Sequence, residues 1–126
     1  MNDDNDKNVR NKDLQPCSHD PLTGFFRNGY CQTGPDDRGE HVVCAQVTQE
    51  FLDYSKSKGN DLMAARPEFG FDGLKPGDKW CLCAARWLEA LEVGVAPPLD
   101  LDATHESLRT HIDREVLEKY AIDSHG

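Results

Sequence analysis

A short β-branched stretch runs directly into an amphipathic stretch, and this junction sets the frame of the expected fold. Residues 41–48 have the sequence HVVCAQVT, whose length and composition are typical of a strand buried on at least one face. The next residues place Phe51 and Leu52 on one helical face, behind Thr48, which suits an N-cap. The sequence therefore predicts a strand that leads into a helix at residues 49–58.

Two later segments also carry helical periodicity. Apolar residues recur at i, i+3, i+4, i+7 and i+11 in residues 78–93, with Asp78 placed as the N-cap. A last helix is expected at residues 113–121, where Asp113 can cap. Before the first helix, Asn28-Gly29 predicts a tight hairpin in which Arg27 faces Tyr30. Between the first two helices, residues 60–77 are expected to form a long ordered loop.

These segments predict the α+β class: a compact two-layer single domain with a small, mainly antiparallel sheet against about three helices, and with long ordered loops. The domain is expected to span residues 15–122. Residues 1–14 are polar and acidic and predict a mobile tail, and residues 123–126 a flexible C-terminus.

Composition excludes several classes of partner. The net charge of −9 and the pI of about 4.9 disfavour nucleic acid and anionic membranes, because both require clustered Lys and Arg. No apolar run approaches the roughly 18–20 residues that span a bilayer, and the first residues lack the apolar core of a signal peptide. A cytoplasmic location is expected. Five cysteines cannot pair completely within one chain, and a reducing cytosol would keep them as thiols.

Several strings of the sequence, in order, look like the signature blocks of one family: CSHDPLTGFFRNGYCQTGPDDRGEHVVCA, SKSKGNDL, PEFGF, GLKPGDKWCLCAARWLEA, and GVAPP followed by ATHE. The chain resembles a small, mostly bacterial family filed only as a domain of unknown function, over roughly residues 16–121. The resemblance implies a compact two-layer α+β domain and no assigned activity. The family pattern often has a Cys-Cys pair where this chain has Tyr30-Cys31.

A reactive thiol is one functional hypothesis. If Asp78 caps the helix, Cys81 lies near the unpaired amides of its first turn, which stabilise a thiolate. A nucleophilic cysteine needs a base, and the candidates are His41 and His105, with His19 as a third histidine. Cys83 shares the face of the tryptophans and is assigned to the core.

A structural zinc site is the weakest alternative. Its ligands would come from His41-x-x-Cys44 and Cys81-x-Cys83, whose spacings differ from the usual C-x₂₋₄-C pattern. Within a helix, Cys81 and Cys83 would point about 160° apart, and His41 and Cys44 would lie on opposite faces of a strand. The sequence therefore predicts no metal site, and it indicates no cofactor.

A binding module with a pocket built from loops is the leading hypothesis. Arginine forks suit a carboxylate or a phosphate, and glycine and aromatic residues concentrate in the same loops. The expected partner is a small anionic ligand or another protein. The candidate ligand-binding residues are Arg27, Tyr30, Arg66 and Arg86.

Overall fold

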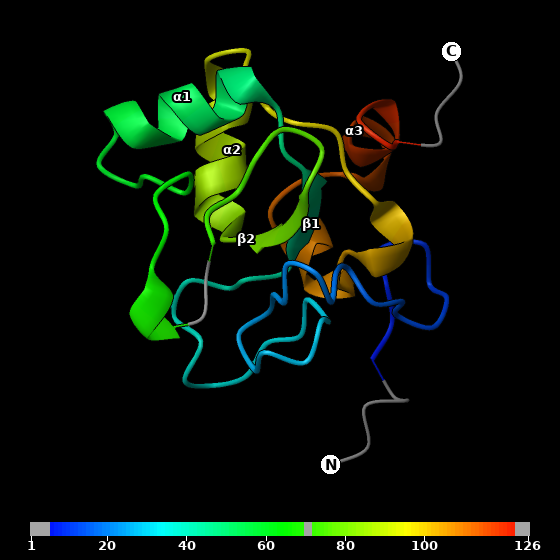
Figure 1. Ribbon diagram of the computed structural model, residues 1–126. Coiled ribbons are helices and arrows are strands. Elements are labelled where there is room, and N and C mark those ends of the chain that lie inside the picture. The colour runs from blue at the N-terminus through cyan, green and yellow to red at the C-terminus, as the bar shows by residue number, and fades with distance from the viewer. Residues whose placement is uncertain (1–5, 70–71, 123–126) are drawn as a thin grey trace.

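The protein is described by a computed structural model over residues 6–69 and 72–122. Its regular structure in these ranges confirms the predicted α+β class, since helices pack against a small antiparallel sheet (Figure 1). The elements in chain order are β1 (Val43–Gln46), α1 (Gln49–Ser57), η2 (Pro67–Phe69), β2 (Lys79–Leu82), α2 (Ala84–Glu92), η3 (Leu101–Ala103), η4 (Glu106–Thr110) and α3 (Arg114–Lys119), where η is a 3₁₀ turn.

The junction between β1 and α1 agrees with the prediction. The hydroxyl of Thr48 accepts a hydrogen bond from the N–H of Phe51 at 3.1 Å, as an N-cap does. Phe51 and Leu52 are fully buried in the main apolar core. Burial of such side chains stabilises the fold by about 1.5–3 kcal/mol each.

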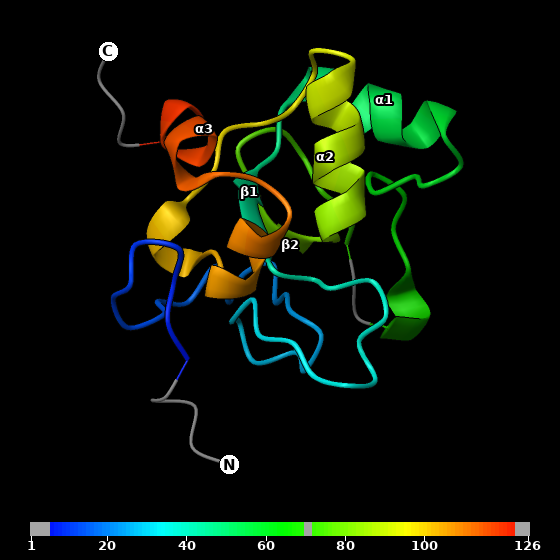
Figure 2. The ribbon, with the colours of Figure 1, turned by 180° about the vertical axis from the view of Figure 1, so that it is seen from behind.

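Helix α2 rises from the end of β2 toward α1, and the loops of residues 16–40 lie below the sheet in both views (Figures 1 and 2). Trp87, in the middle of α2, is fully buried and donates its indole N–H to the carbonyl of Pro97 at 3.0 Å. Its ring also packs edge-on against Tyr120, with the centroids 5.4 Å apart. These contacts hold α2 in the core and so fix the position of Cys83, which directly precedes the helix.

The predicted helix over residues 78–93 is wrong in its first part. Lys79–Leu82 form β2, which pairs with β1, and the helix begins only at Ala84. Asp78 caps no helix; its carboxylate accepts the N–H of Lys75 at 3.1 Å and closes the turn before β2. Periodicity records which side chains are apolar, not which strand lies beside them, so it could not reveal this pairing. The correction moves Cys83 from the helix interior to the N-cap position.

The predicted hairpin at Asn28-Gly29 is also wrong. Arg27 adopts a positive φ of 55°, and the N–H of Gly29 bonds back to the carbonyl of Thr23 at 3.0 Å. No strand ladder flanks this turn in the described part of the chain, so Arg27 and Tyr30 are not a cross-strand pair. The backbone polar groups of this loop form hydrogen bonds within the loop and do not form a strand ladder.

The predicted N-terminal tail is too long. Val9 is fully buried in the core, and Asn8 is 1 % exposed. The Asn8 amide donates to the carbonyl of Asp102 at 3.0 Å, while its oxygen accepts the N–H groups of Arg10 and Lys12. Residues 6–14 therefore belong to the fold. The remainder of both predicted ends, residues 1–5 and 123–126, lies outside the described residues.

Candidate functional site

Four of the five cysteines are joined in two disulfides, Cys17–Cys44 and Cys31–Cys81. All five lie within the described ranges, and Cys83 is the free one. The expectation that the cysteines remain thiols is therefore contradicted. Cys81, predicted as the reactive thiol, carries none in this state, because β2 places it beside Cys31 in a buried cluster.

Cys83, His41 and Asp37 form one continuous chain of contacts. The Sγ of Cys83 lies 3.3 Å from Nε2 of His41, and Nδ1 of His41 lies 2.6 Å from Oδ1 of Asp37. The Asp37 side chain is fully buried, whereas that of His41 is 37 % exposed. A thiol, a base and a carboxylate that orients the base are the parts of a nucleophilic cysteine site.

The loop of residues 37–42 is tied to the start of α2, and this tie places the histidine beside the thiol. The carbonyl of Glu40 accepts the N–H of Ala84 at 3.0 Å and that of Val42 at 2.8 Å. Glu40 has a φ of 49°, in the left-handed region that a side-chain-bearing residue seldom occupies. Cys83 is the N-cap residue of α2, yet its side chain makes no capping bond, so its sulfur is available to His41.

Asp37 is held by several hydrogen bonds. Its Oδ2 accepts the backbone N–H of His41 at 2.9 Å and the hydroxyl of Thr33 at 3.1 Å. Burial alone raises the pKa of the Asp37 carboxyl, but the bonds from the His41 backbone and ring and from Thr33 outweigh it, and the pKa lies below the ordinary 3.8. Asp37 is therefore an anion at neutral pH, aimed at Nδ1 of His41.

The pKa of His41 is raised to about 9. The largest cause is its hydrogen bond with Cys83; burial opposes the rise, and the bond to Asp37 adds to it. At pH 7 the ring therefore carries a proton on both nitrogens, with Nδ1–H donated to Asp37 and Nε2–H to the sulfur of Cys83. The imidazolium therefore places a proton donor 3.3 Å from the sulfur of Cys83.

Replacement of Asp37 by Asn is expected to destabilise the protein at neutral pH and to matter less in acid. Because folding lowers the pKa of Asp37, its contribution is fully present above pH 3.8 and is lost as pH falls further. Melting temperatures of both proteins between pH 2.5 and pH 7 measure this. The gap between them should narrow below pH 3.8, and a gap that stays constant would contradict the assignment.

Two adjoining pockets open beside this site. One, of about 200 Å³, is lined by His41, Phe25 and Arg27, and the other, of about 540 Å³, extends from Arg27 to Lys75. Both share Arg27 and Trp80, whose ring lies 5.5 Å from the guanidinium carbon. Phe25 also stacks on the ring of His41, with the centroids 6.2 Å apart.

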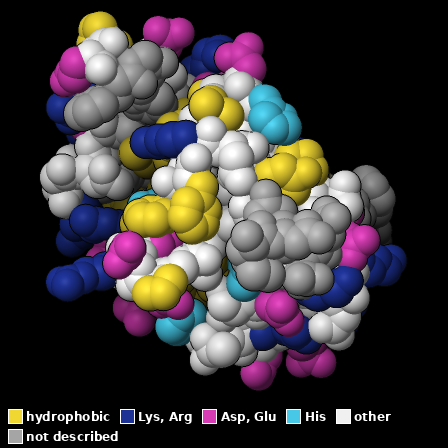
Figure 3. All heavy atoms as spheres, turned by 90° about the horizontal axis from the view of Figure 1, so that it is seen from below, with side chains coloured by type: hydrophobic (Ala, Val, Ile, Leu, Met, Phe, Trp, Pro, Cys, Tyr) yellow, Lys and Arg dark blue, Asp and Glu magenta, His cyan; other side chains and the backbone are white. Residues whose placement is uncertain are grey.

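Apolar side chains are exposed next to the pockets. Leu22, Phe25 and Phe26 are 46 %, 38 % and 53 % exposed. Figure 3 views the side of the molecule formed by the loops below the sheet, where hydrophobic, histidine, basic and acidic side chains all appear. The surroundings of the candidate site thus combine apolar groups with charges of both signs, since Asp20, Asp72 and Asp78 line the larger pocket.

The other predicted site residues lie elsewhere. Arg86 faces Glu89 on the exposed side of α2, at 3.6 Å. Arg66 is exposed, Tyr30 is partly buried, and neither lines the two pockets. His105 caps η4, and its ring contacts Ser107 and Asp6 rather than a cysteine. Of the predicted set, the structure brings His41, Arg27 and the disulfide-bonded Cys81 to one pocket.

Sequence reasoning missed Cys83 and Asp37. Asp37 precedes His41 by four residues, a spacing that one loop can close. The predicted helix over residues 78–93 assigns Cys83 to the core, whereas the helix begins only at Ala84. The odd number of cysteines was the available signal, since two bridges leave one thiol.

No helix in the described part of the chain combines the length and the apolar character that crossing a membrane requires. No curated protein matches the chain. One family model does match, over residues 7–121, and it is described as an uncharacterized protein conserved in bacteria (DUF2237). The match confirms the resemblance to an uncharacterised bacterial family that the sequence suggested. The chain belongs to this uncharacterised bacterial family, DUF2237.

Proposed function

We propose that the protein is a thiol enzyme in which Cys83 attacks an electrophilic carbon, His41 moves the proton and Asp37 orients His41. The observation that carries the proposal is the continuous contact from sulfur to imidazole to buried carboxylate. A cysteine that only packs in a core needs no such partners, because free cysteines behave as small hydrophobes. The thiol enzyme suggested by the sequence used Cys81 with His41, whereas the present proposal takes Cys83 as the nucleophile and keeps His41.

Acyl transfer is the reaction class that fits these groups. The sulfur of Cys83 forms a bond to a carbonyl carbon, and the leaving group departs with the proton of Nε2 of His41. Water or another acceptor then attacks the thioester and gives its proton to His41, and cleavage of the S–C bond returns the thiolate–imidazolium pair. Asp37 stabilises the protonated ring and keeps Nε2 directed at the sulfur.

The substrate is proposed to carry an anionic or polar group beside the reacting carbon. Arg27 lies between the two pockets and can pair with a carboxylate or a phosphate, while Phe25 and Trp80 offer apolar walls. The binding role expected from the sequence is thus retained as substrate recognition. A cytoplasmic location and the absence of nucleic-acid and membrane partners remain predictions, and the disulfides are more typical of oxidising compartments.

An activated ester tests the proposal without knowledge of the substrate. With p-nitrophenyl acetate, the protein should release a burst of one equivalent of p-nitrophenol and carry one acetyl group on the peptide that contains Cys83. Cys83→Ser should give no burst. A burst that survives this change, or the absence of any acyl adduct with esters and thioesters alike, would overturn the proposal.

Substitutions at two glycines distinguish an effect on the candidate site from an effect on the stability of the fold. A Cβ at Gly39 would lie 3.0 Å from the sulfur of Cys83 and 3.0 Å from Cε1 of His41, too close for the pair to keep its geometry. Gly39→Ala should therefore reduce the burst rate and leave the melting temperature close to that of the native protein. Gly34→Ala is the matched control, because its Cβ would meet only Phe26, at 3.5 Å. Equal effects of both changes would contradict the assignment.

A further inference from the structure

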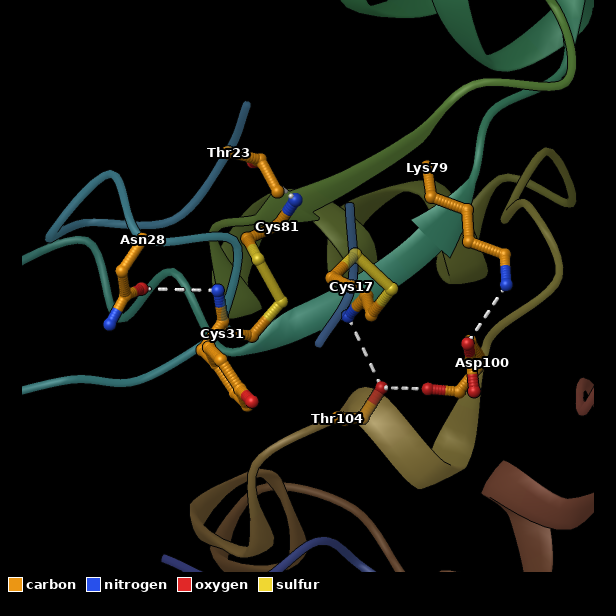
Figure 4. Close-up of a disulfide and its surroundings, with 10 residues drawn as sticks. Cys17, Thr23, Asn28, Cys31, Lys79, Cys81, Asp100 and Thr104 are labelled. Atoms are coloured by element: carbon orange, nitrogen blue, oxygen red, sulfur yellow. Dashed lines mark hydrogen bonds and ion pairs between the residues drawn. A yellow bond between two sulfur atoms is a disulfide. The ribbon is translucent and has the colours of Figure 1, made fainter. Parts of the chain in front are cut away.

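The four bridged cysteines form one cluster beneath the sheet, where the two disulfides lie side by side (Figure 4). The sulfur atoms of Cys17, Cys31 and Cys81 all lie within 4.8 Å of one another. Each of these residues is at most 6 % exposed. Cys44 joins them through its bond to Cys17.

The strand register brings the fourth sulfur to the same side. Cys44 and Cys81 stand directly opposite each other in the β1–β2 pair. The N–H of Cys44 donates to the hydroxyl of Thr104, and that of Cys81 to the hydroxyl of Thr23, so neither bonds to the facing strand. They are therefore a non-hydrogen-bonded pair, the arrangement in which facing side chains lie closest.

Four cysteine sulfurs are one of the ligand sets of structural zinc sites. Zinc binds four cysteine sulfurs at about 2.3 Å, which places the sulfurs about 3.8 Å from one another. The sulfurs of Cys17, Cys31 and Cys81, within 4.8 Å of one another, would have to shift to reach that separation, and Cys44 would have to turn toward them once its bond to Cys17 opens. The four cysteines are buried, as the ligands of structural zinc sites are.

We propose that the reduced protein binds one Zn²⁺ through Cys17, Cys31, Cys44 and Cys81. Two equivalents of a dithiol reductant each give two electrons and two protons, become disulfides and break the two S–S bonds. Zinc then replaces thiol protons, which pass to solvent. In the reverse direction, two equivalents of a disulfide oxidant accept two electrons each from the thiolates and take up protons from solvent, both S–S bonds re-form and the metal is released. The same four cysteines would thus cross-link the chain either through two disulfides or through one zinc ion.

This ligand set differs from the one that the sequence suggested. His41 and Cys83 hold each other in the candidate active site and take no part in the cluster. The sequence argument against zinc assumed a helix at Cys81, whereas β2 directs Cys81 toward Cys31 and Cys44. The site therefore becomes visible only after the strand pairing is known.

Metal analysis of the reduced protein tests the proposal. The protein is reduced anaerobically with a phosphine, mixed with one equivalent of Zn²⁺ and desalted. Elemental analysis should find about one zinc per chain. The disulfide form, mixed with Zn²⁺ and desalted without the reduction step, should retain none. With Co²⁺, the reduced protein should show the sulfur-to-cobalt charge-transfer bands of a tetrahedral four-thiolate site.

Two variants locate the ligands. Cys83→Ser, which removes the thiol outside the cluster, should bind as the native chain does, and Cys81→Ser should lose most of the affinity. The cobalt spectrum of the native chain decides the matter if Cys81→Ser does not fold. No retained metal, a spectrum with fewer than four thiolates, or loss of binding in Cys83→Ser would each overturn the proposal. The ester burst is measured separately on the disulfide form, so the two proposals fail independently.

Discussion

His41→Gln is expected to slow the acylation of Cys83 by about a hundredfold or more, the range by which a positioned acid–base group contributes. Glutamine fills similar space but cannot carry a proton to the leaving group. The change should leave the fold intact, because the His41 side chain is 37 % exposed and Asp37 keeps its bonds from Thr33 and from the backbone N–H of residue 41. Burst kinetics with p-nitrophenyl acetate at pH 7 measure the effect.

A second measurement identifies the charge on His41 as the cause. The imidazolium should attract anionic iodoacetate, so the native protein should favour it over neutral iodoacetamide by about fivefold more than His41→Gln does, since about 1 kcal/mol is expected for a solvated charge pair. With a His41 pKa of about 9, the preference should persist at pH 7 and fade as pH passes 9.

His111 supplies the matched control. Its side chain is 36 % exposed and lies 3.1 Å from a carboxylate oxygen of Glu40, much as His41 lies beside Asp37. His111→Gln should change neither the burst nor the reagent preference. A preference that is the same in the native protein and in His41→Gln would show that no thiolate–imidazolium pair forms.

Features that depend on neighbouring residues could be predicted from the sequence, and features that depend on contacts between distant segments could not. The α1 segment was predicted well, because a cap and an apolar face are local properties of residues 48–57. The hairpin at Asn28-Gly29 and the helix start at Asp78 were wrong, because both depend on which segment lies alongside. The identity of the free thiol depends on the same information. The β1–β2 register places Cys44 and Cys81 opposite each other, and both belong to the buried cysteine cluster, whereas Cys83 lies outside it.

The candidate site was predictable in part for the same reason. His41 could be named from its chemistry, since few side chains serve as a base near neutral pH. Cys83 could not, because its role depends on a carbonyl of residue 40 that reaches the first turn of α2. A contact across 44 positions of sequence leaves no periodic trace in the intervening residues.

Removal of the Cys31–Cys81 disulfide is expected to cost about 4 kcal/mol of unfolding free energy, from the entropy of closing a loop of the 50 residues that separate the two cysteines. The total free energy of unfolding of a native domain is about 5–15 kcal/mol, so this loss is a large fraction of it. The double variant Cys31→Ala/Cys81→Ala avoids new thiols, and the comparison is made with the native disulfide form in a chelator. Urea denaturation followed by circular dichroism measures the loss.

Loop length also orders the variants. Cys17→Ala/Cys44→Ala removes a bridge between cysteines 27 residues apart and should cost about 0.5 kcal/mol less than the first pair. Cys83→Ala, at a partly exposed N-cap that makes no capping bond, should cost far less than either. A loss below about 1 kcal/mol for both double variants would contradict the bridges, because a closed loop must lower the entropy of the unfolded chain. If the bridges hold and zinc restores the stability of the reduced native chain, the same four positions clamp the fold in both states.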